Sequence, residues 1–180
     1  LPQACACTRL EGIVSSSFQP SGIITLTTDF GHKGPFVAMI KGAILSRFPT
    51  AKIVDLTHEI VEHWPAEAGF WLDRAHPYFP KGSVHVAVVD PSVGTERRIV
   101  AVLTDGQLFL APDNGLLAPM AEREGAVTRS LDLKKLAAVI PERRSATFAG
   151  RDVFAPVAAE LAAGRLEFEK VGPKATDLTP

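Results

Sequence analysis

The chain has 180 residues, of which 46% are hydrophobic and 22% are charged, which is typical of one globular domain with a substantial core. Nineteen Lys and Arg residues nearly balance 20 Asp and Glu residues, so the charge excludes the basic field of a nucleic-acid-binding protein. Every apolar run is far shorter than the ~20 residues that cross a bilayer, so we expect no membrane contact.

The ends of the chain carry few structural signals. Residues 1–22 are expected to form a leader of unclear structure, because they show no clear periodicity, and they resemble neither a secretion signal nor a transit peptide. Cys5 and Cys7 are one residue apart, which suits neither a disulfide nor a zinc site, and this cysteine usage fits a reducing cytoplasm. The polar stretch 173–180 has no terminating element and indicates a piece of a longer protein.

The first half of the chain alternates between predicted strands and predicted helices. Apolar β-rich runs predict strands at 23–28, 52–56 and 84–89, the last two of a buried type, and apolar spacing of three and four predicts helices at 36–47 and 65–75. Pro49 stops the first helix and Pro65 starts the second. This order predicts a parallel sheet covered on both faces.

The second half adds a hairpin to this sheet. Asp105 and Gly106 separate two apolar runs, 99–103 and 107–111, which is a hairpin signal. The later predicted elements are a short helix at 116–123, a strand at 127–131, a helix at 133–140 and a last helix at 154–163 that Gly164 closes. The predicted fold is therefore α/β, a three-layer α/β/α sandwich with a mixed, mostly parallel central sheet.

Polar clusters at 27–31, 90–98 and 147–152 follow predicted strands or precede the last helix, where ligands bind in open α/β sheets. Asp29, two residues before a glycine, can accept hydrogen bonds from the vicinal hydroxyls of a ribose, or it can be a turn or cap residue. The loop after Asp90 is shaped to return Arg97 toward it. Such a pair keeps the carboxylate ionised and orients a water, although a purely structural ion pair fits equally.

Other polar residues in these regions have simpler interpretations. We expect Arg98 to be structural or solvated, and Arg151 to pair with Asp152 or with another acid at a strand end, while Asp152 can also cap the last helix. The segment 113–115 is expected to be a plain turn. The histidines of the segment 58–63 are five residues apart, which does not match the spacing of a zinc protease.

Five motifs occur in one order along the chain. They are Thr-Thr-Asp-Phe-Gly at 27–31, Val-Asp-Leu-Thr-His at 54–58, Val-Asp-Pro-x-Val-Gly-Thr-x-Arg-Arg at 89–98, Pro-Asp-Asn-Gly-Leu-Leu at 112–117 and Thr-Phe-x-Gly-Arg-Asp at 147–152. Together they resemble the S-adenosylmethionine (SAM) hydroxide adenosyltransferase family, which is related to the fluorinating and chlorinating enzymes. The resemblance implies an N-terminal catalytic domain at 23–172, with 173–180 starting the linker to a C-terminal β-barrel domain.

The resemblance also implies a reaction and roles for five residues. Activated water attacks the ribose 5′ carbon of SAM, releasing methionine and adenosine, with no metal and no other cofactor. Asp29 would hold the ribose hydroxyls, Asp90 and Arg97 would position the water, and Phe148 and Gly150 would line the pocket. The C-terminal domain would supply most adenine and methionine contacts, and the site would form between subunits of a homotrimer.

Two residues depart from the family pattern. Ala149 stands where the family has a catalytic histidine, and loss of such a proton-handling group typically costs ~10²–10⁴-fold in rate. Ser92 stands where the family has glycine, which would cost ~1 kcal/mol if the position needs a positive φ. A catalytically silent domain that binds SAM or adenosine, or that serves assembly, is therefore the alternative. The Asp90 carboxylate argues against a halide nucleophile, which it would repel.

Overall fold

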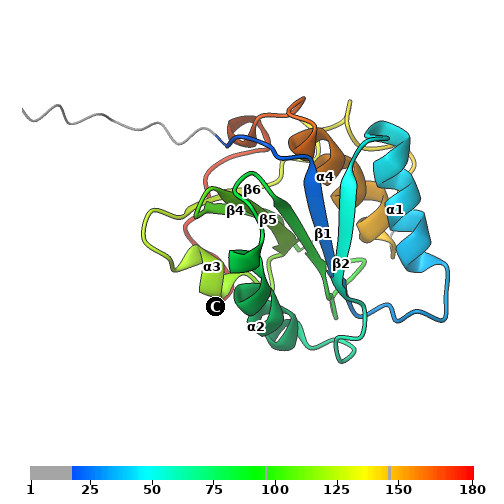
Figure 1. Cartoon of the computed structure of the whole chain (residues 1–180), viewed down its shortest axis with the longest axis horizontal. Helices are drawn as coiled ribbons and strands as arrows, with labels where there is room; N and C mark the ends of the chain where they lie inside the picture. The colour runs from blue at the N-terminus through cyan, green and yellow to red at the C-terminus, as the bar shows by residue number, and fades with distance from the viewer. Residues whose placement is uncertain (1–17, 96, 146) are drawn as a thin grey trace, which may run out of the picture.

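The structure, a computed structural model, describes residues 18–180 except 96 and 146, and a six-stranded sheet forms its centre (Figure 1). The strands are β1 (Ile23–Thr28), β2 (Lys52–Thr57), β3 (Val84–Val88), β4 (Ile99–Thr104), β5 (Gln107–Pro112) and β6 (Val127–Ser130). They lie in the order β2-β1-β3-β5-β4-β6. The four strands from β2 to β5 pair in parallel, whereas β4 is antiparallel to both β5 and β6.

Helices cover both faces of the sheet. The helical elements are α1 (Phe36–Arg47), α2 (Pro65–Ala75), η1 (His76–Tyr78), α3 (Ala118–Ala121), η2 (Gly150–Phe154), α4 (Ala155–Ala162) and η3 (Phe168–Lys170). Strand side chains alternate between two apolar cores, so Val86 packs on the side of α1 and α4 while Ala87 packs on the side of α2 and α3. The predicted three-layer α/β/α fold with a mixed, mostly parallel sheet is confirmed.

The hairpin between β4 and β5 shows how local sequence sets the strand pairing. Asp105 and Gly106 have φ of 53° and 74°, the left-handed pair that a two-residue hairpin turn needs. Glycine adopts this conformation without cost, and aspartate tolerates it better than most residues. The predicted hairpin is confirmed, and it fixes the register that pairs Thr104 with Gln107.

Two local predictions were wrong. The segment 133–140 forms a series of turns instead of a helix, with single backbone bonds such as that from Ile140 N–H to the Leu136 carbonyl. The strand β2 is exposed along much of its length instead of buried, since it lies at the sheet edge and only β1 pairs with it. The predicted last helix is confirmed as α4 to within one residue at each end, and a π-helical turn at 150–154 precedes it.

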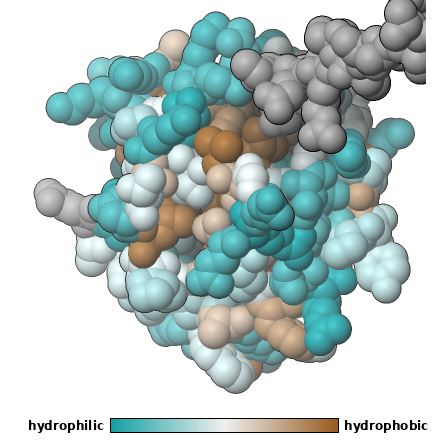
Figure 2. Space-filling model, turned by 90° about the vertical axis from the view of Figure 1, so that its left-hand side faces the viewer, coloured by the Kyte–Doolittle hydropathy of each residue, from teal (hydrophilic) through white to brown (hydrophobic). Residues whose placement is uncertain are grey.

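One face of the molecule is largely polar, and the C-terminal segment packs along the molecule. The face over β6 and α3 is mostly hydrophilic, with small separate hydrophobic patches (Figure 2). Within 18–180, gaps excepted, no helix combines the length and apolarity needed to cross a bilayer. The segment 173–180 lies along the molecule, where Asp177 accepts a hydrogen bond from Arg98 and the Thr179 N–H donates to Asp113. Cys5 and Cys7 lie outside the described residues.

Candidate active site

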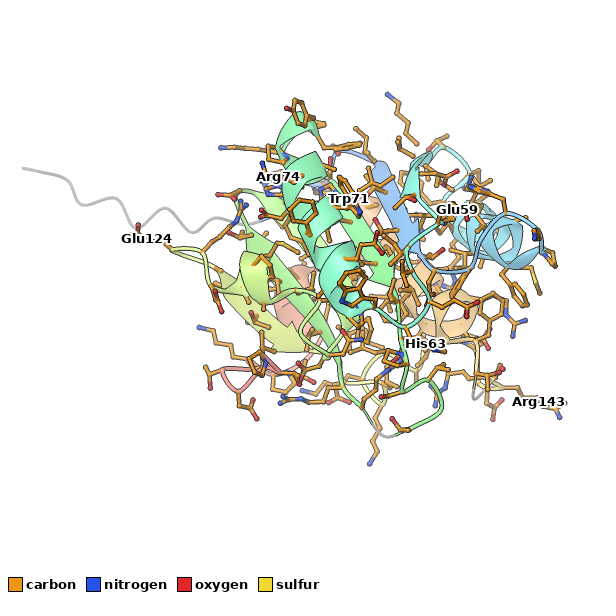
Figure 3. The ribbon with its side chains drawn as sticks, turned by 90° about the horizontal axis from the view of Figure 1, so that it is seen from below. Glu59, His63, Trp71, Arg74, Glu124 and Arg143 are labelled. Carbon is orange, nitrogen blue, oxygen red and sulfur yellow. The ribbon has the colours of Figure 1, made fainter. Side chains whose placement is uncertain are left out.

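The carboxyl ends of β1 and β3 open into one cavity of about 290 Å³, which we call the strand-end pocket. It gathers all five residues that the sequence analysis selected. Its lining residues are Asp29, Phe30, Glu62, His63, Val88, Asp90, Val93, Arg97, Thr147, Phe148, Ala149 and Gly150. Figure 3 views the molecule from this end and shows His63 near its middle, with Arg143 at the outer edge. Three polar clusters that are distant in sequence therefore meet at one place.

A larger cavity of about 460 Å³ lies between α3, β6 and the segment 174–180. It contains none of the residues that the sequence analysis selected. Its polar lining consists mainly of threonines, together with the charged residues Glu122 and Lys174. We assign the chemistry to the strand-end pocket because a buried, charged acid and base face each other only there among the described cavities.

The centre of the strand-end pocket is an ion pair between Asp90 and Arg97. The Arg97 Nη2 atom contacts Asp90 Oδ2, and the two side chains are only 4% (Asp90) and 13% (Arg97) exposed. The Asp90 Oδ1 atom accepts a hydrogen bond of 3.0 Å from the Ser92 N–H. Burial lowers the pKa of the Arg97 guanidinium. The predicted pairing of the two side chains is confirmed.

Arg97 also has one N–H donor that the ion pair does not use. Within the described residues, its buried Nε atom has no hydrogen-bond partner, and Asp90 Oδ2 has no hydrogen bond of good geometry beyond the ion pair. A buried donor without a partner costs free energy, so it favours a water or a ligand atom at that position. The pair therefore leaves, among the described residues, one carboxylate oxygen and one guanidinium N–H without a well-aligned partner in the wall of the pocket.

Asp29 lies on the other side of the pocket, one residue after β1. Its Oδ2 atom accepts a hydrogen bond of 3.1 Å from the backbone N–H of His63. No other hydrogen bond to this carboxylate forms within the described residues, so its remaining lone pairs are free for ligand hydroxyls. His63 has a positive φ of 61°, a strained conformation for a residue other than glycine, which turns its N–H toward Asp29.

The third wall of the pocket comes from the π-helical turn that precedes α4. Phe148 packs edge to face against Phe30, with ring centroids 6.0 Å apart. Gly150 is buried, and a Cβ atom there would approach Ile40 Cδ1 at 3.0 Å, so a side chain would crowd this wall. Ala149 lies between them and presents only a methyl group to the pocket that holds Asp90. π-Helical turns of this kind occur often at functional sites.

The residues next to these walls have structural roles. Arg151 pairs with Asp152 through Nε at 2.6 Å and Nη2 at 2.9 Å. Of the two partners expected for Arg151, the structure therefore shows Asp152. Asp152 does not cap the last helix; it accepts instead from the Ser145 N–H at 2.7 Å. Arg98 is a structural residue that binds Asp113, as expected, and no residue of the segment 113–115 lines the strand-end pocket.

Two details of the site differ from expectation or were missed. Ser92 has no positive φ, so the backbone strain expected for a serine at this position is absent; Gly94, with φ of 90°, makes the turn instead. Glu62 and His63 line the pocket but were not selected from the sequence. The nearby motif at 54–58 was the one sequence feature that pointed to this region. The path of the loop that returns Glu62 and His63 to Asp29 follows no regular spacing of apolar residues, so the sequence pattern did not predict it.

No metal site is evident in the described part of the chain. No group of three or more His, Cys, Asp or Glu side chains is placed to hold a metal ion within these residues. His58 and His63 do not face a common point. The His58 side chain is buried against Thr28, whereas His63 is exposed and its backbone contacts Asp29.

A mixed α/β sheet with an Asp–Arg pair and a free carboxylate at its strand ends defines a small-molecule site of the type found in open α/β proteins. The sequence at 24–172 matches the family model described as the SAM hydroxide adenosyltransferase N-terminal domain. The chain belongs to this family.

Curated relatives and solved structures agree with this membership. The chain is 44% identical over 141 residues to the (R)-S-adenosyl-L-methionine hydrolase of Salinispora arenicola, covering 78% of this chain and 53% of the relative. It is 30% identical over 179 residues to a fluorinase of Actinopolyspora mzabensis, covering 86% and 58%. A crystal structure of an uncharacterized conserved protein from Thermotoga maritima matches with a TM-score of 0.80 and 38% identity, covering 86% of this chain and 59% of that one. The chain thus spans little more than half the length of these relatives.

Proposed function

We propose that this chain is the ribose- and water-binding half of an enzyme that hydrolyses SAM to adenosine and L-methionine. The observation that carries the proposal is the meeting of Asp29, Asp90, Arg97, Phe148 and Gly150 in one pocket. Family membership and the hydrolase names of relatives such as that of Salinispora arenicola support it. The volume of about 290 Å³ is at the low end for ligand sites, which suits a pocket that holds part of its substrate.

The proposed reaction is a displacement at the ribose 5′ carbon. The oxygen of a water forms a bond to this carbon while the carbon–sulfur bond breaks, and the electron pair of that bond leaves with sulfur as the neutral thioether of methionine. Since the sulfonium is a good leaving group, the enzyme must mainly align and desolvate the nucleophile. Asp90 would accept the proton of the water, and the Arg97 guanidinium beside it would help to position the water oxygen.

The ribose would be held on the opposite wall. Asp29 would accept hydrogen bonds from the two ribose hydroxyls, because only one bond within the described residues uses its carboxylate. Phe148 and Gly150 would enclose the reacting carbon, and a side chain in place of Gly150 would have to displace Ile40 Cδ1. The reaction as proposed needs no metal and no other cofactor.

Ala149 sets the expected rate. Its methyl group cannot move a proton, so we expect hydrolysis ~10²–10⁴-fold slower than with a histidine there. Binding would remain, since Ala149 removes no contact made by Asp29 or Arg97. The alternative function is therefore a catalytically silent domain that binds SAM or adenosine, or serves assembly, and Ala149 is the observation that favours it.

An Ala149→His substitution separates the two functions. We would fuse the chain to the C-terminal half of the Salinispora arenicola relative and measure adenosine release from both sulfonium epimers of SAM by chromatography. The enzyme proposal predicts a rate increase of ~10²-fold or more for Ala149→His. The matched control carries Asp90→Asn as well and should lose that gain. A fusion that binds SAM equally with either residue and releases no adenosine would establish the silent domain instead.

Three further properties belong to the same proposal. Residues 23–172 would be the catalytic domain, and 173–180 would lead to a C-terminal β-barrel domain that supplies most adenine and methionine contacts. The full-length form would be a cytoplasmic homotrimer with sites between subunits. Exposed aromatic side chains on and before α2, including Trp64 and Trp71, support a buried role for this face in an assembly. Sedimentation of the fusion protein tests the trimer.

A further inference from the structure

A row of polar contacts runs from the end of β1 to α1, beside the loop that carries Asp29, and the proposed reaction does not use it. His58 has a fully buried side chain, 0% exposed. Its Nδ1 atom lies 2.8 Å from Thr28 Oγ1, and its Nε2 atom lies 3.1 Å from Asp55 Oδ1. The Lys41 Nζ atom then donates to Asp55 Oδ2 at 2.6 Å.

The donors and acceptors in this row are consistent with one protonation pattern. Thr28 Oγ1 accepts from the Phe30 N–H at 3.3 Å, which leaves its own hydrogen free to donate to His58 Nδ1. The ring proton then sits on Nε2 and faces Asp55, although it does not point straight at the oxygen. Burial raises the pKa of Asp55, but its contacts with the Lys41 ammonium and the His58 ring lower it more.

The same residues hold the Asp29 loop through its backbone. The Gly31 N–H donates to the His58 carbonyl at 2.8 Å, two residues beyond Asp29. Five residues after His58, the His63 N–H donates to Asp29 Oδ2 at 3.1 Å. Thr28 is the residue directly before Asp29. The segment 58–63 therefore contacts the Asp29 loop on both sides, and its first residue is fixed by the buried ring.

We propose that His58 is a positioning residue, which acts through Thr28 and the His63 N–H to aim the Asp29 carboxylate at the ribose hydroxyls. His58 does not line the strand-end pocket. It lines an adjoining cavity of about 510 Å³ that shares Asp29, Phe30 and Glu62 with that pocket, so Asp29 is a direct connection between His58 and the strand-end pocket. The expected effect of His58 on ribose binding rests on the proposed function, whereas its effect on the position of the Asp29 carboxylate does not.

The chain contains a matched control for this network. Thr25 Oγ1 lies 2.8 Å from His85 Nδ1, the same contact at the same distance as between Thr28 and His58. Both threonines belong to β1 and both are buried, but Thr28 directly precedes Asp29, whereas Thr25 lies four residues before it. Thr28→Val and Thr25→Val each leave one buried histidine nitrogen without its hydroxyl partner, and Thr28→Val also removes the acceptor of the Phe30 N–H. Thr28→Val should therefore cost somewhat more thermal stability than Thr25→Val, whereas Thr28→Ser keeps the hydroxyl and both of its hydrogen bonds.

The first readout needs no ligand. In ¹⁵N-labelled protein, the amide proton of His63 reports its bond to Asp29. We expect Thr28→Val to shift this resonance and to speed its hydrogen exchange at least tenfold, while Thr25→Val and Thr28→Ser leave both unchanged. An unchanged His63 amide in Thr28→Val overturns the proposal. So does an equal change in Thr25→Val, which would mean general loosening of β1.

The second readout links positioning to binding. Calorimetry compares adenosine with 2′-deoxyadenosine, which lacks one of the two hydroxyls that Asp29 would hold. Thr28→Val should reduce the preference for adenosine about tenfold, and Thr25→Val should retain it. A wild-type chain without any preference would contradict the proposed ribose role of Asp29. The His63 amide would then still decide whether His58 positions this carboxylate.

Discussion

Asp90 and Arg97 differ from the neighbouring pair of Arg98 and Asp113 mainly in the burial of the arginine. The Arg97 side chain is 13% exposed and that of Arg98 is 38% exposed, while both carboxylates are buried. Removing the buried arginine leaves a carboxylate whose only other hydrogen bond within the described residues comes from the Ser92 N–H. Asp113, in contrast, keeps a bond from the Thr179 N–H. The two arginines should therefore contribute very differently to stability.

Arg97→Met should lower the free energy of unfolding by about 3 kcal/mol, because it leaves Asp90 buried without a counter-charge. Arg98→Met, the matched control, should cost about 1 kcal/mol, since water screens the more exposed pair. Urea unfolding at pH 7 measures both values. Equal costs for the two substitutions would mean that Asp90 is not held as an ionised, paired carboxylate.

The sequence predicted single site residues well where they directly follow a strand. Asp29 and Asp90 lie at strand ends, so the topology alone brings them to one edge of the sheet. His63 was missed because it contributes a backbone N–H from a loop, at a left-handed φ of 61° that no side-chain pattern reveals. The strain expected at Ser92 was wrong, because the neighbouring Gly94 takes the positive φ.

Helix packing makes opposite demands on two glycines. A Cβ atom on Gly69 in α2 would lie 2.5 Å from the Leu116 carbonyl oxygen, so the helix can approach this loop only without a side chain. A Cβ atom on Gly42 in α1 would meet nothing within 4 Å. The two residues share a helical conformation and differ only in their surroundings.

Gly42→Ala should stabilise the protein by about 0.5–1 kcal/mol, because alanine has a lower entropy cost in a helix and meets open space. Gly69→Ala should destabilise it by about 1–3 kcal/mol, because the new methyl group forces α2 away from Leu116. Thermal unfolding of both variants beside the wild type tests this difference. A stabilising Gly69→Ala would show that α2 does not pack on this carbonyl.

At the level of elements, the sequence predicted α1 and α2 with their observed bounds, because a proline stands at or beyond one end of each. The apolar residues of α1 do not form one buried face, since Phe36, Met39 and Leu45 are exposed. Periodicity failed at 133–140, where Leu136 and Ile140 are buried at helical spacing although the backbone forms only separate turns. The buried spacing there reflects packing against the core, not a continuous helix. The π-helical turn before α4 was likewise invisible, since its sequence also suits an α-helix.

The response of the whole molecule to pH depends on a buried histidine. His85 is 0% exposed and stacks on Phe109, and burial together with the charge of His76 lowers its pKa from 6.5 to about 4. Between these values the unfolded chain binds a proton that the folded chain does not. Stability therefore falls as the pH drops from 6.5 to 4. The pKa values of Asp152 and Glu160 are lowered in the folded chain, so these carboxylates also stabilise it, and this contribution is lost mainly below about pH 4.

We expect His85 to account for up to about 3 kcal/mol of lost stability between pH 6.5 and 4. Urea unfolding at half-unit steps of pH measures the slope. His85→Gln should be less stable at pH 7 but should lose much less stability on acidification. A slope that His85→Gln leaves unchanged would place the acid sensitivity elsewhere in the molecule.

The most direct test of the account is an NMR titration of the ¹⁵N-labelled chain with adenosine. We predict that the changes in amide shift centre on the strand-end pocket, at His63, Val93 and Gly150. The amide shifts of Ala126 and Ala175, which line the larger cavity beside α3, should not change. Changes centred on that larger cavity, or no change at millimolar adenosine, would contradict the assignment of the strand-end pocket as the nucleoside site.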